Sequence, residues 1–326
     1  MKAIIASRQV TKNDDLPYTE IVDHPLLAIV GPTGSGKSDL ALYLDGRLDG
    51  ELVNCDSMQV YRRFDIGTSK TAAHLVDIAD PDEVFTAGEY AKRGREVLRE
   101  IASHGRLPIV VGGTGFYLRA LFEGLFPGPT RDEALRARLM EREERRPGSL
   151  HRILSRFDAP AAARIHANDI NKTIRAVEVC LLARRPLSTM FLEGRAALAG
   201  FRIIKVGLNP PRHRLYERLD QRFARMIDSG LLDEVRQILA SGISPGSKPF
   251  ESLGYKQALA AVRGELSLEA AIASAQMETR RYAKRQMTWF RREHDVTWFQ
   301  GFGDCPELQK QVFEFAQRSF TESGLS

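Results

Sequence analysis

A glycine-rich stretch near the start of the chain places the strongest constraint on its fold. Five apolar residues, Leu26–Val30, are followed by Gly-Pro-Thr-Gly-Ser-Gly-Lys-Ser at positions 31–38. An apolar run of this length before a turn is typical of a buried strand, and the run from Asp39 to Leu44 is typical of the helix after it. Strand, turn and helix in this order, with G-x-x-x-x-G-K-S spacing, form a P-loop pattern. The pattern predicts a phosphate or diphosphate site at the start of that helix.

The residue types of this loop suit anion binding. Glycines let backbone N–H groups converge on an anion, and the helix N-terminus adds partial positive charge. Lys37 supplies a full positive charge, and the Ser38 hydroxyl can ligate Mg²⁺, which we expect as the cofactor. The residues expected to hold the diphosphate are Gly31, Pro32, Thr33, Gly34, Ser35, Gly36, Lys37 and Ser38.

Composition narrows the class of protein. The chain has 326 residues, 43% hydrophobic and 27% charged, which is ordinary for a globular protein. No apolar run approaches the roughly 20 residues that cross a bilayer. Cys55, Cys180 and Cys305 lie too far apart for paired zinc ligands or a disulfide framework. We therefore expect a cytoplasmic protein without a membrane segment, and its net charge of +5 permits a polyanionic partner.

Strand-like and helix-like runs alternate along most of the chain. Further strands are predicted at 51–57, 107–111, 201–208 and 296–299, with helices at 87–104, 116–122, 215–229, 231–240, 255–262 and 268–292. This alternation indicates an α/β fold, a P-loop NTPase-like parallel sheet flanked by helices. The Arg- and Glu-rich segment 131–200 has helical patterns, including 159–164 and 171–184, and no strand. We therefore divide the chain into a leader, 1–24, an α/β core, 25–130 and 201–326, and an all-helical insertion, 131–200.

Polar residues stand at the ends of three predicted strands. Lys37 and Ser38 follow the first, Asp56 lies at the carboxyl end of the second, and Thr114 follows the third. Because ligands of open parallel sheets bind at the carboxyl edge, we expect these residues to share one site. For Asp56 the alternatives are a carboxylate that acts on substrate and a loop cap. For Thr114 they are a site residue and a helix cap.

One predicted helix, 268–292, carries a cluster of cations. Helical spacing places one set of residues on a common face: Arg281, Lys284, Arg285, Thr288 and Arg292. A different set lies on the face expected to pack inward: Tyr282, Gln286, Trp289 and Phe290. Basic side chains without nearby acids indicate contacts with RNA phosphates, and a solvated surface is the alternative.

A second cluster lies in the predicted helix 215–229. Arg218 and Arg222 are one turn apart and can project in the same direction, so that they can clamp a diphosphate. The alternative is ion pairing with Glu217 or Asp220 in the same helix.

Together these motifs resemble those of tRNA dimethylallyltransferases. The resemblance covers roughly residues 25–300 and lies in the P-loop, Asp56–Tyr61, Asp65–Thr68, Val111–Leu118, Leu253–Lys256 and Ala283–Phe290. It implies transfer of a dimethylallyl group from its diphosphate to N6 of the adenosine next to the anticodon, tRNA position 37, with release of diphosphate. The partners that it implies are the tRNA anticodon stem-loop and dimethylallyl diphosphate. It implies a monomer and no obligate protein partner.

The resemblance also implies residue roles. Asp56 would accept a proton from the N6 amine, Lys37 and Arg218 would contact the diphosphate, and Thr114 would contact the base and orient Asp56. Contacts with tRNA are implied for Asp56, Ser57, Met58, Gln59, Thr114, Arg136, Asn171, Lys172, Thr173, Ile174, Arg175, Glu251, Gly254, Tyr255, Lys256, Arg281, Lys284, Arg285 and Thr288. The chain departs from the family where many members have Gln-Arg, since it has Asn171-Lys172, and Lys172 lacks planar two-point geometry.

Three other functions share parts of this pattern. An adenylate isopentenyltransferase has the same core motifs but normally lacks the long helical insertion and the basic helix. A P-loop small-molecule kinase leaves the cations at 281–292 unexplained. A non-catalytic RNA-binding protein has no need of Asp56 beside a P-loop.

Overall fold

A five-stranded parallel sheet forms the centre of the computed structural model, which describes residues 23–321. The strand order is β2-β3-β1-β4-β5, and every pair is parallel, with Leu27 opposite both Ile109 and Ile204. The strands are β1 (His24–Val30), β2 (Gly50–Asn54), β3 (Leu107–Val111), β4 (Phe201–Leu208) and β5 (Val296–Phe299). The predicted parallel α/β sheet is therefore confirmed.

The N-terminal end of the sheet corrects one predicted boundary. β1 begins at His24, inside the predicted leader, because His24 pairs with Phe201 of β4. The rest of that leader, residues 1–22, lies outside the described residues. Across residues 23–321, no helix combines the length and the apolar composition needed to cross a membrane.

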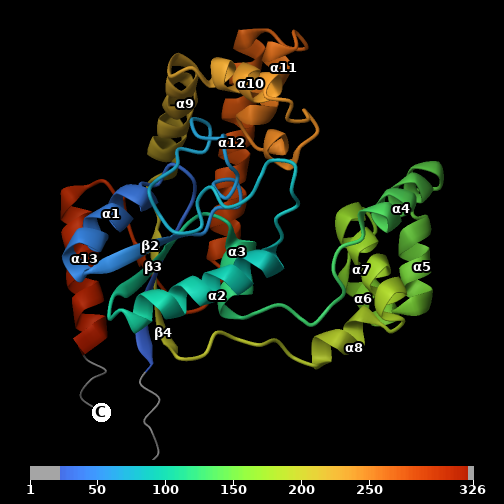
Figure 1. The fold of residues 1–326 in the computed structure, drawn as a ribbon, viewed down its shortest axis with the longest axis horizontal. Helices are drawn as coiled ribbons and strands as arrows, with labels where there is room; N and C mark the ends of the chain where they lie inside the picture. The colour runs from blue at the N-terminus through green and yellow to red at the C-terminus, as the bar shows by residue number, and fades with distance from the viewer. Residues whose placement is uncertain (1–22, 322–326) are drawn as a thin grey trace, which may run out of the picture.

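Helices cover both faces of the sheet (Figure 1). Alternate strand residues point to opposite faces. Leu26, Ala28 and Val30 pack against α2 (Ala87–Ser103), α3 (Gly115–Phe122) and the end of α12 (Leu268–Phe290). Leu27 and Ile29 pack against α1 (Lys37–Leu48) and α13 (Pro306–Thr321). The central strand is thus buried on both sides, which explains its uninterrupted apolar sequence.

A third layer of helices lies beside the carboxyl end of the sheet. It consists of α9 (Arg212–Asp228), α10 (Leu231–Ala240), the 3₁₀ helix η1 (Lys248–Glu251), α11 (Tyr255–Val262) and α12. Phe64, Phe223, Phe250 and Tyr255 form its apolar centre. Because Phe64 belongs to the irregular segment after β2, this cluster anchors that segment next to the P-loop.

The strand-free segment folds as a helical unit that stands apart from the sheet in Figure 1. Its helices are α4 (Glu133–Arg145), α5 (Ser149–Phe157), α6 (Ala159–Arg164), α7 (Ile170–Ala183) and α8 (Leu187–Leu192). They share their own apolar cluster, which includes Leu150, Leu154 and Ile174. Two linkers join the unit to the core, and the second returns alongside the end of α3, where Leu198 N–H donates to Phe122 C=O at 2.8 Å.

Candidate active site

The P-loop connects the central strand to α1 and has the backbone shape that anion binding requires. Gly34 has φ +76° and Gly36 has φ +83°, a left-handed conformation that residues with a Cβ rarely adopt. Gly36 is the N-cap of α1, so the helix begins at Lys37. The helix N-terminus and the loop N–H groups therefore stand together at the carboxyl edge of the sheet. This geometry matches the one predicted from the glycine spacing.

The loop receives support from a segment that sequence reasoning missed. The backbone N–H of Gly303, after β5, donates to Ser35 C=O at 2.9 Å. A Cβ on Gly303 would stand 2.2 Å from the Gly36 carbonyl oxygen, so only glycine fits at this position. The segment Gly301–Asp304 thus supports the P-loop from the edge of the sheet. Its two glycines are the sequence feature that could have indicated such a close backbone contact.

Lys37 lies with its amine inside the site. Its Nζ donates to Pro32 C=O at 2.8 Å. Burial lowers the pKa of Lys37 to about 8, although the Asp56 carboxylate opposes this change and Arg222 adds to it. At neutral pH the amine remains about nine-tenths protonated, since the pKa is about one unit above the pH. A diphosphate next to the amine would restore its ordinary charge.

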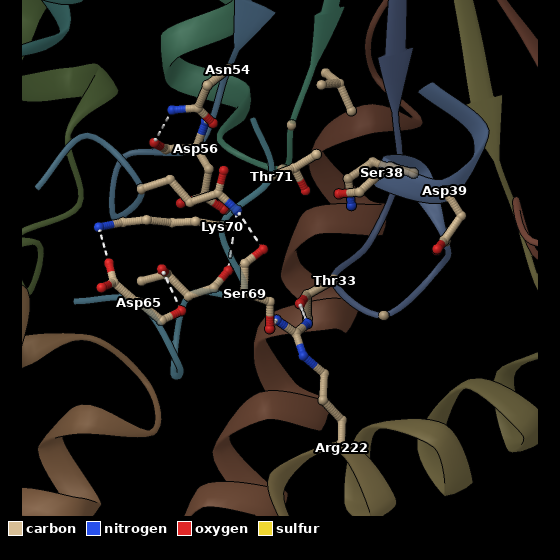
Figure 2. A pocket seen from close by; sticks show the side chains of 18 of the residues that line it. Thr33, Ser38, Asp39, Asn54, Asp56, Asp65, Ser69, Lys70, Thr71 and Arg222 are labelled. Atoms are coloured by element: carbon tan, nitrogen blue, oxygen red, sulfur yellow. Dashed lines mark hydrogen bonds and ion pairs between the residues drawn. The ribbon is translucent and has the colours of Figure 1, made fainter. Parts of the chain in front are cut away.

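Arg222 reaches the P-loop from α9, as Figure 2 shows. Its guanidinium donates to the Thr33 hydroxyl at 2.9 Å and to the Ser69 hydroxyl at 3.0 Å. Burial lowers its pKa, which Asp56 partly offsets. Because the guanidinium bonds hydroxyls rather than a carboxylate, its positive charge remains available to an anion. Sequence reasoning placed Arg222 in a possible clamp but not among the predicted catalytic residues.

Arg218 is oriented differently. It donates to the Asp304 carboxylate at 2.8 Å, and its guanidinium lies 5.0 Å from the centre of the Phe302 ring. The predicted alternative of ion pairs within α9 is therefore wrong for both arginines. Asp220 instead accepts from Arg280 of α12.

Asp56 and Thr114 lie beyond the carboxyl ends of β2 and β3, as predicted, and these strands are neighbours in the sheet, but the two residues contact each other only indirectly. Asp56 Oδ1 accepts from the Met58 N–H at 2.9 Å, and the Asp56 N–H donates to Asn54 at 2.9 Å. The Thr114 hydroxyl accepts from the Ser57 N–H at 3.0 Å and makes no capping bond to α3. Thr114 thus occupies the N-cap position of α3, as one of the two predicted alternatives has it, but its hydroxyl holds Ser57, the residue after Asp56, instead of capping the helix.

Two adjoining cavities meet at Asp56. The first has a volume of about 800 Å³ and includes the P-loop, Lys37 and Ser38. The second, about 470 Å³, includes Phe223, Tyr282 and other residues of α9 and α12. The residues that line both are Thr33, Asp56, Thr68, Arg222 and Met226. Asp56 is the carboxylate among these five residues, and Figure 2 shows it in the first cavity.

The oxygen donors of the first cavity fit Mg²⁺ only if the substrate completes its ligand set. The Ser38 hydroxyl and the Asp39 carboxylate lie at the start of α1 beside the P-loop. Within residues 23–321, no group of three His, Cys, Asp or Glu residues could hold a metal. Mg²⁺ commonly takes one or two protein oxygens together with phosphate oxygens and waters. The residues present suit that arrangement.

Several residues predicted to contact tRNA lie beside the cavities. Ser57, Met58, Glu251, Gly254 and Arg285 line the second cavity. Gln59 lines the first, and its amide donates to the carbonyl groups of Thr68 and Ser69.

α12 has the two faces that its spacing predicts. Arg281, Lys284, Arg285, Thr288 and Arg292 are exposed, whereas Gln286 and Phe290 are buried. We call Arg281, Lys284 and Arg285 the cationic face of α12. Within residues 23–321 none of these three forms an ion pair with a carboxylate. Lys256, at the start of α11, is also exposed.

Some predicted RNA contacts are buried instead. Tyr255 is enclosed in the third layer, where its hydroxyl bonds Glu234 and accepts from the Gly67 N–H at 3.1 Å. Thr173 and Ile174 are only 2% and 1% exposed; Ile174 belongs to the apolar cluster of the insertion, and the Thr173 hydroxyl donates to Asp169 C=O. Tyr255 thus holds the loop that lines the site, and Thr173 and Ile174 pack inside the insertion. Gly254 is likewise buried and has φ +92° before α11.

Two predicted RNA-binding arginines of the insertion share one buried carboxylate. Arg136 and Arg175 lie 3.1 Å and 2.8 Å from Glu178, which is 0% exposed. Arg175 also donates to Pro129 C=O. The structure gives both side chains an internal role and leaves Asn171 and Lys172 exposed, with Lys172 paired to Asp169.

Comparisons with known proteins agree with one another. A family model described as IPP transferase matches residues 59–293. The chain is 57% identical to a tRNA dimethylallyltransferase of Solibacter usitatus, over 89% of this chain and 97% of that one. It is 54% identical to another from Koribacter versatilis, over 91% and 99%.

Solved structures give the same result. A tRNA isopentenylpyrophosphate transferase from Bacillus halodurans is similar at 36% identity and a TM-score of 0.68, covering 92% of this chain and 98% of that one. A eukaryotic dimethylallyltransferase acting on tRNA is similar at 25% identity and a TM-score of 0.76, covering 92% and 79%.

Proposed function

This chain belongs to the IPP transferase family and is a tRNA dimethylallyltransferase, and we propose that its reaction takes place where its two cavities meet. The substrates are dimethylallyl diphosphate and a tRNA, and the product carries the dimethylallyl group on N6 of the adenosine next to the anticodon. The observation that carries the proposal is the position of Asp56, which lines both the P-loop cavity and its neighbour.

This position suits a general base. An exocyclic amine is a weak nucleophile, because its lone pair is delocalised into the ring. As the amine nitrogen forms a bond to C1 of the dimethylallyl group, the Asp56 carboxylate accepts the amine proton. The bond between C1 and the diphosphate oxygen breaks, and its electron pair leaves with the diphosphate. The adenine therefore has to reach Asp56 through the second cavity, and the dimethylallyl diphosphate through the P-loop cavity.

The P-loop cavity stabilises the leaving group. Backbone N–H groups of the loop, the Lys37 amine and the Arg222 guanidinium converge on the place where the diphosphate would lie. Such preorganised charge is commonly the largest contribution to catalysis. Ser38 would hold a Mg²⁺ that adds positive charge at the diphosphate when bound. Arg218 would contribute from the outer side, after its guanidinium turns from Asp304.

The second cavity suits an extruded base. Tyr282 and Phe223 supply aromatic surface, and Asp56 stands at its inner end. An adenosine in an unpaired loop can leave its stack and enter such a pocket. The cationic face of α12 would bind phosphates of the anticodon stem-loop, and the insertion, 131–200, would cover that loop. The tRNA substrate and the free cysteines support a cytoplasmic enzyme, which we expect to act as a monomer.

A direct assay tests this proposal. Purified protein, Mg²⁺ and dimethylallyl diphosphate are incubated with tRNA that carries adenosine 3′ of the anticodon, and in parallel with AMP. We expect a prenylated nucleoside from the tRNA and none from AMP, and an adenosine-to-guanosine change at the target position should abolish the product. Product from AMP alone would make the protein an adenylate isopentenyltransferase.

A further inference from the structure

Gln286 connects the inner side of α12 to two parts of the active site. Its side chain is only 6% exposed. Its amide Nε2 donates to Gly113 C=O at 2.8 Å, and its Oε1 accepts from the Thr33 N–H at 2.8 Å. One side chain from a helix therefore bridges the P-loop and the turn after β3. No step of the proposed mechanism uses it.

The contact between α12 and this turn leaves no free space. A Cβ on Gly113 would stand 2.4 Å from Gln286 Nε2, and one on Gly115 would stand 2.2 Å from Trp289 Nε1. Gln286 and Trp289 are three residues apart, so they share one face of the helix. Thr114 lies between the two glycines. A shift of α12 along or around its axis therefore has to move this turn, because close-packed interiors do not absorb such a displacement.

On the P-loop side, Gln286 bonds Thr33, one of the residues that line both cavities. Thr33 lines both cavities, and its N–H bonds Gln286 while its hydroxyl accepts from Arg222. The position of this part of the P-loop thus depends on α12 through Gln286 and on α9 through Arg222.

Two residues of the cationic face, Arg281 and Lys284, lie on the side of α12 opposite Gln286, whereas Arg285 lies between the two sides and lines the second cavity. All three side chains are exposed and form no ion pair within the described part of the chain. The same helical turns that present Lys284 and Arg285 to solvent hold Gln286 against the active site. A ligand that engages the cationic face therefore acts on the helix that positions the P-loop.

We propose that Gln286 is a positioning residue that couples RNA binding on the cationic face of α12 to diphosphate binding in the P-loop. The inference rests on the proposed function, because it takes RNA as the ligand of that face. RNA that fixes α12 also fixes the Thr33 N–H and the Thr114 turn, and the diphosphate then binds a loop that is already ordered. Linkage requires the effect to be reciprocal, so that diphosphate tightens RNA binding by the same factor.

Calorimetric titration of the full chain measures this coupling. Inorganic diphosphate with Mg²⁺ is titrated at fixed salt, with and without a saturating anticodon stem-loop RNA. For the wild-type protein we expect RNA to lower the diphosphate Kd by about fivefold or more, within the usual range of couplings. In Gln286→Met, which keeps the side-chain length and removes both hydrogen bonds, we expect this ratio to fall to about one. RNA affinity should change by less than about twofold, since the cationic face is intact.

A glutamine elsewhere on α12 supplies the matched control. Gln276 donates to Asp220 C=O of α9 and not to the P-loop or to the turn after β3, so Gln276→Met should retain the wild-type ratio. Gln286→Glu is a second variant that can still accept from Thr33 but, when ionised, cannot donate to Gly113, and it should give a reduced ratio even if the methionine variant fails to fold.

Two results would overturn the inference: a coupling ratio near one in the wild-type protein, or a wild-type ratio in both Gln286 variants. Failure of the proposed function is distinguishable, because the wild-type protein would then form no prenylated tRNA at all.

Discussion

The arginines of the active site and those of the helical insertion look alike in the sequence but serve different purposes. Arg222 of α9 bonds two hydroxyl groups and keeps its charge for a ligand. Arg136 and Arg175 of the insertion surround a carboxylate that is 0% exposed. A basic residue is thus a candidate phosphate ligand only where no buried acid has already neutralised it.

The carboxylate responsible, Glu178, acts as the centre of the insertion. It also accepts from the Asp132 N–H at 2.8 Å, so that it ties the start of α4 to α7. Burial by itself would raise the pKa of Glu178, but the Arg175 guanidinium and these hydrogen bonds hold it below its ordinary value. The Arg222 guanidinium in the core is therefore available to a ligand, whereas Arg136, Arg175 and Glu178 in the insertion hold helices together.

The largest effect is expected at the carboxylate of the core. Asp56→Asn keeps an oxygen that can accept from the Met58 N–H but removes the general base. We expect the single-turnover rate of prenyl transfer to fall by about 10² or more, with little change in melting temperature. A rate within about threefold of wild type would exclude Asp56 as the base.

The carboxylate of the insertion should affect stability instead. Glu178→Ala leaves Arg136 and Arg175 without their shared partner, and we expect the free energy of unfolding of the insertion to fall by about 2 kcal/mol, less than for a fully buried pair. Glu141→Ala, which removes an exposed pair with Arg145, should change it by less than about 0.5 kcal/mol. Urea denaturation measures both. Equal effects would remove the distinction between the two regions.

The same carboxylate predicts a pH dependence. Because the pKa of Glu178 is lower in the folded protein, its contribution to stability is present above its ordinary pKa of 4.5 and is lost as the pH falls through the folded value. The stability of the wild-type protein should therefore fall more steeply with decreasing pH than that of a variant without this carboxylate. Glu178→Gln tests this through the slope of stability against pH between about 3 and 5.

Two arginines of α9, Arg222 and Arg218, are expected to contribute unequally to donor binding in the core. Arg222→Ala should lower kcat/KM for dimethylallyl diphosphate by about tenfold or more, as expected for loss of one charged hydrogen bond. Arg218→Ala should have a smaller effect, because Asp304 already engages that guanidinium. Steady-state kinetics at saturating tRNA measure both, and a larger effect of Arg218→Ala would reverse the assignment.

Deprotonation of Lys37 should weaken donor binding in alkali. With a pKa of about 8, the amine loses its charge as the pH rises from 7 to 9, so the KM for dimethylallyl diphosphate should rise by up to about tenfold. Lys37→Arg should be less active but lack this rise, since a guanidinium remains charged. A KM of the wild-type protein that stays constant to pH 9 would contradict the lowered pKa.

The smallest effect is expected on the outer surface. Arg281→Ala should weaken tRNA binding a few-fold and reduce the slope of log K against log salt by about one. Arg145→Ala, which removes a cation already paired with Glu141, should leave the slope unchanged. Identical slopes for the two variants would make the cationic face of α12 a solvated surface.

Local signals were sufficient for much of the fold. The strands at 107–111, 201–208 and 296–299 and the helices at 159–164, 231–240 and 255–262 have the predicted bounds. Apolar periodicity and flanking glycines determine these elements, and the glycine spacing determines the P-loop. Thr86, just before the predicted helix 87–104, caps α2, because its hydroxyl accepts from the Glu89 N–H.

The remaining features depend on partners that are distant in the sequence. The first part of the predicted helical insertion forms two helices, because α4 ends at Arg145 and α5 begins at Ser149 after Pro147 and Gly148, whose φ is +75°. Tyr255 was predicted to contact RNA, but its hydroxyl bonds Glu234 and Gly67, which are distant in the sequence. Arg218 pairs with the carboxylate of Asp304, which is 86 positions away in the sequence. Helical spacing shows which side chains share a face but not which element that face meets.

The position of Asp56 between donor and base is best tested by a crystal structure with a non-reactive dimethylallyl thiodiphosphate and an anticodon stem-loop. We predict diphosphate oxygens against the P-loop and Lys37, and the N6 amine of the extruded adenosine within about 3 Å of an Asp56 oxygen. A diphosphate bound outside the P-loop, or an Asp56 carboxylate directed away from the base, would contradict the account.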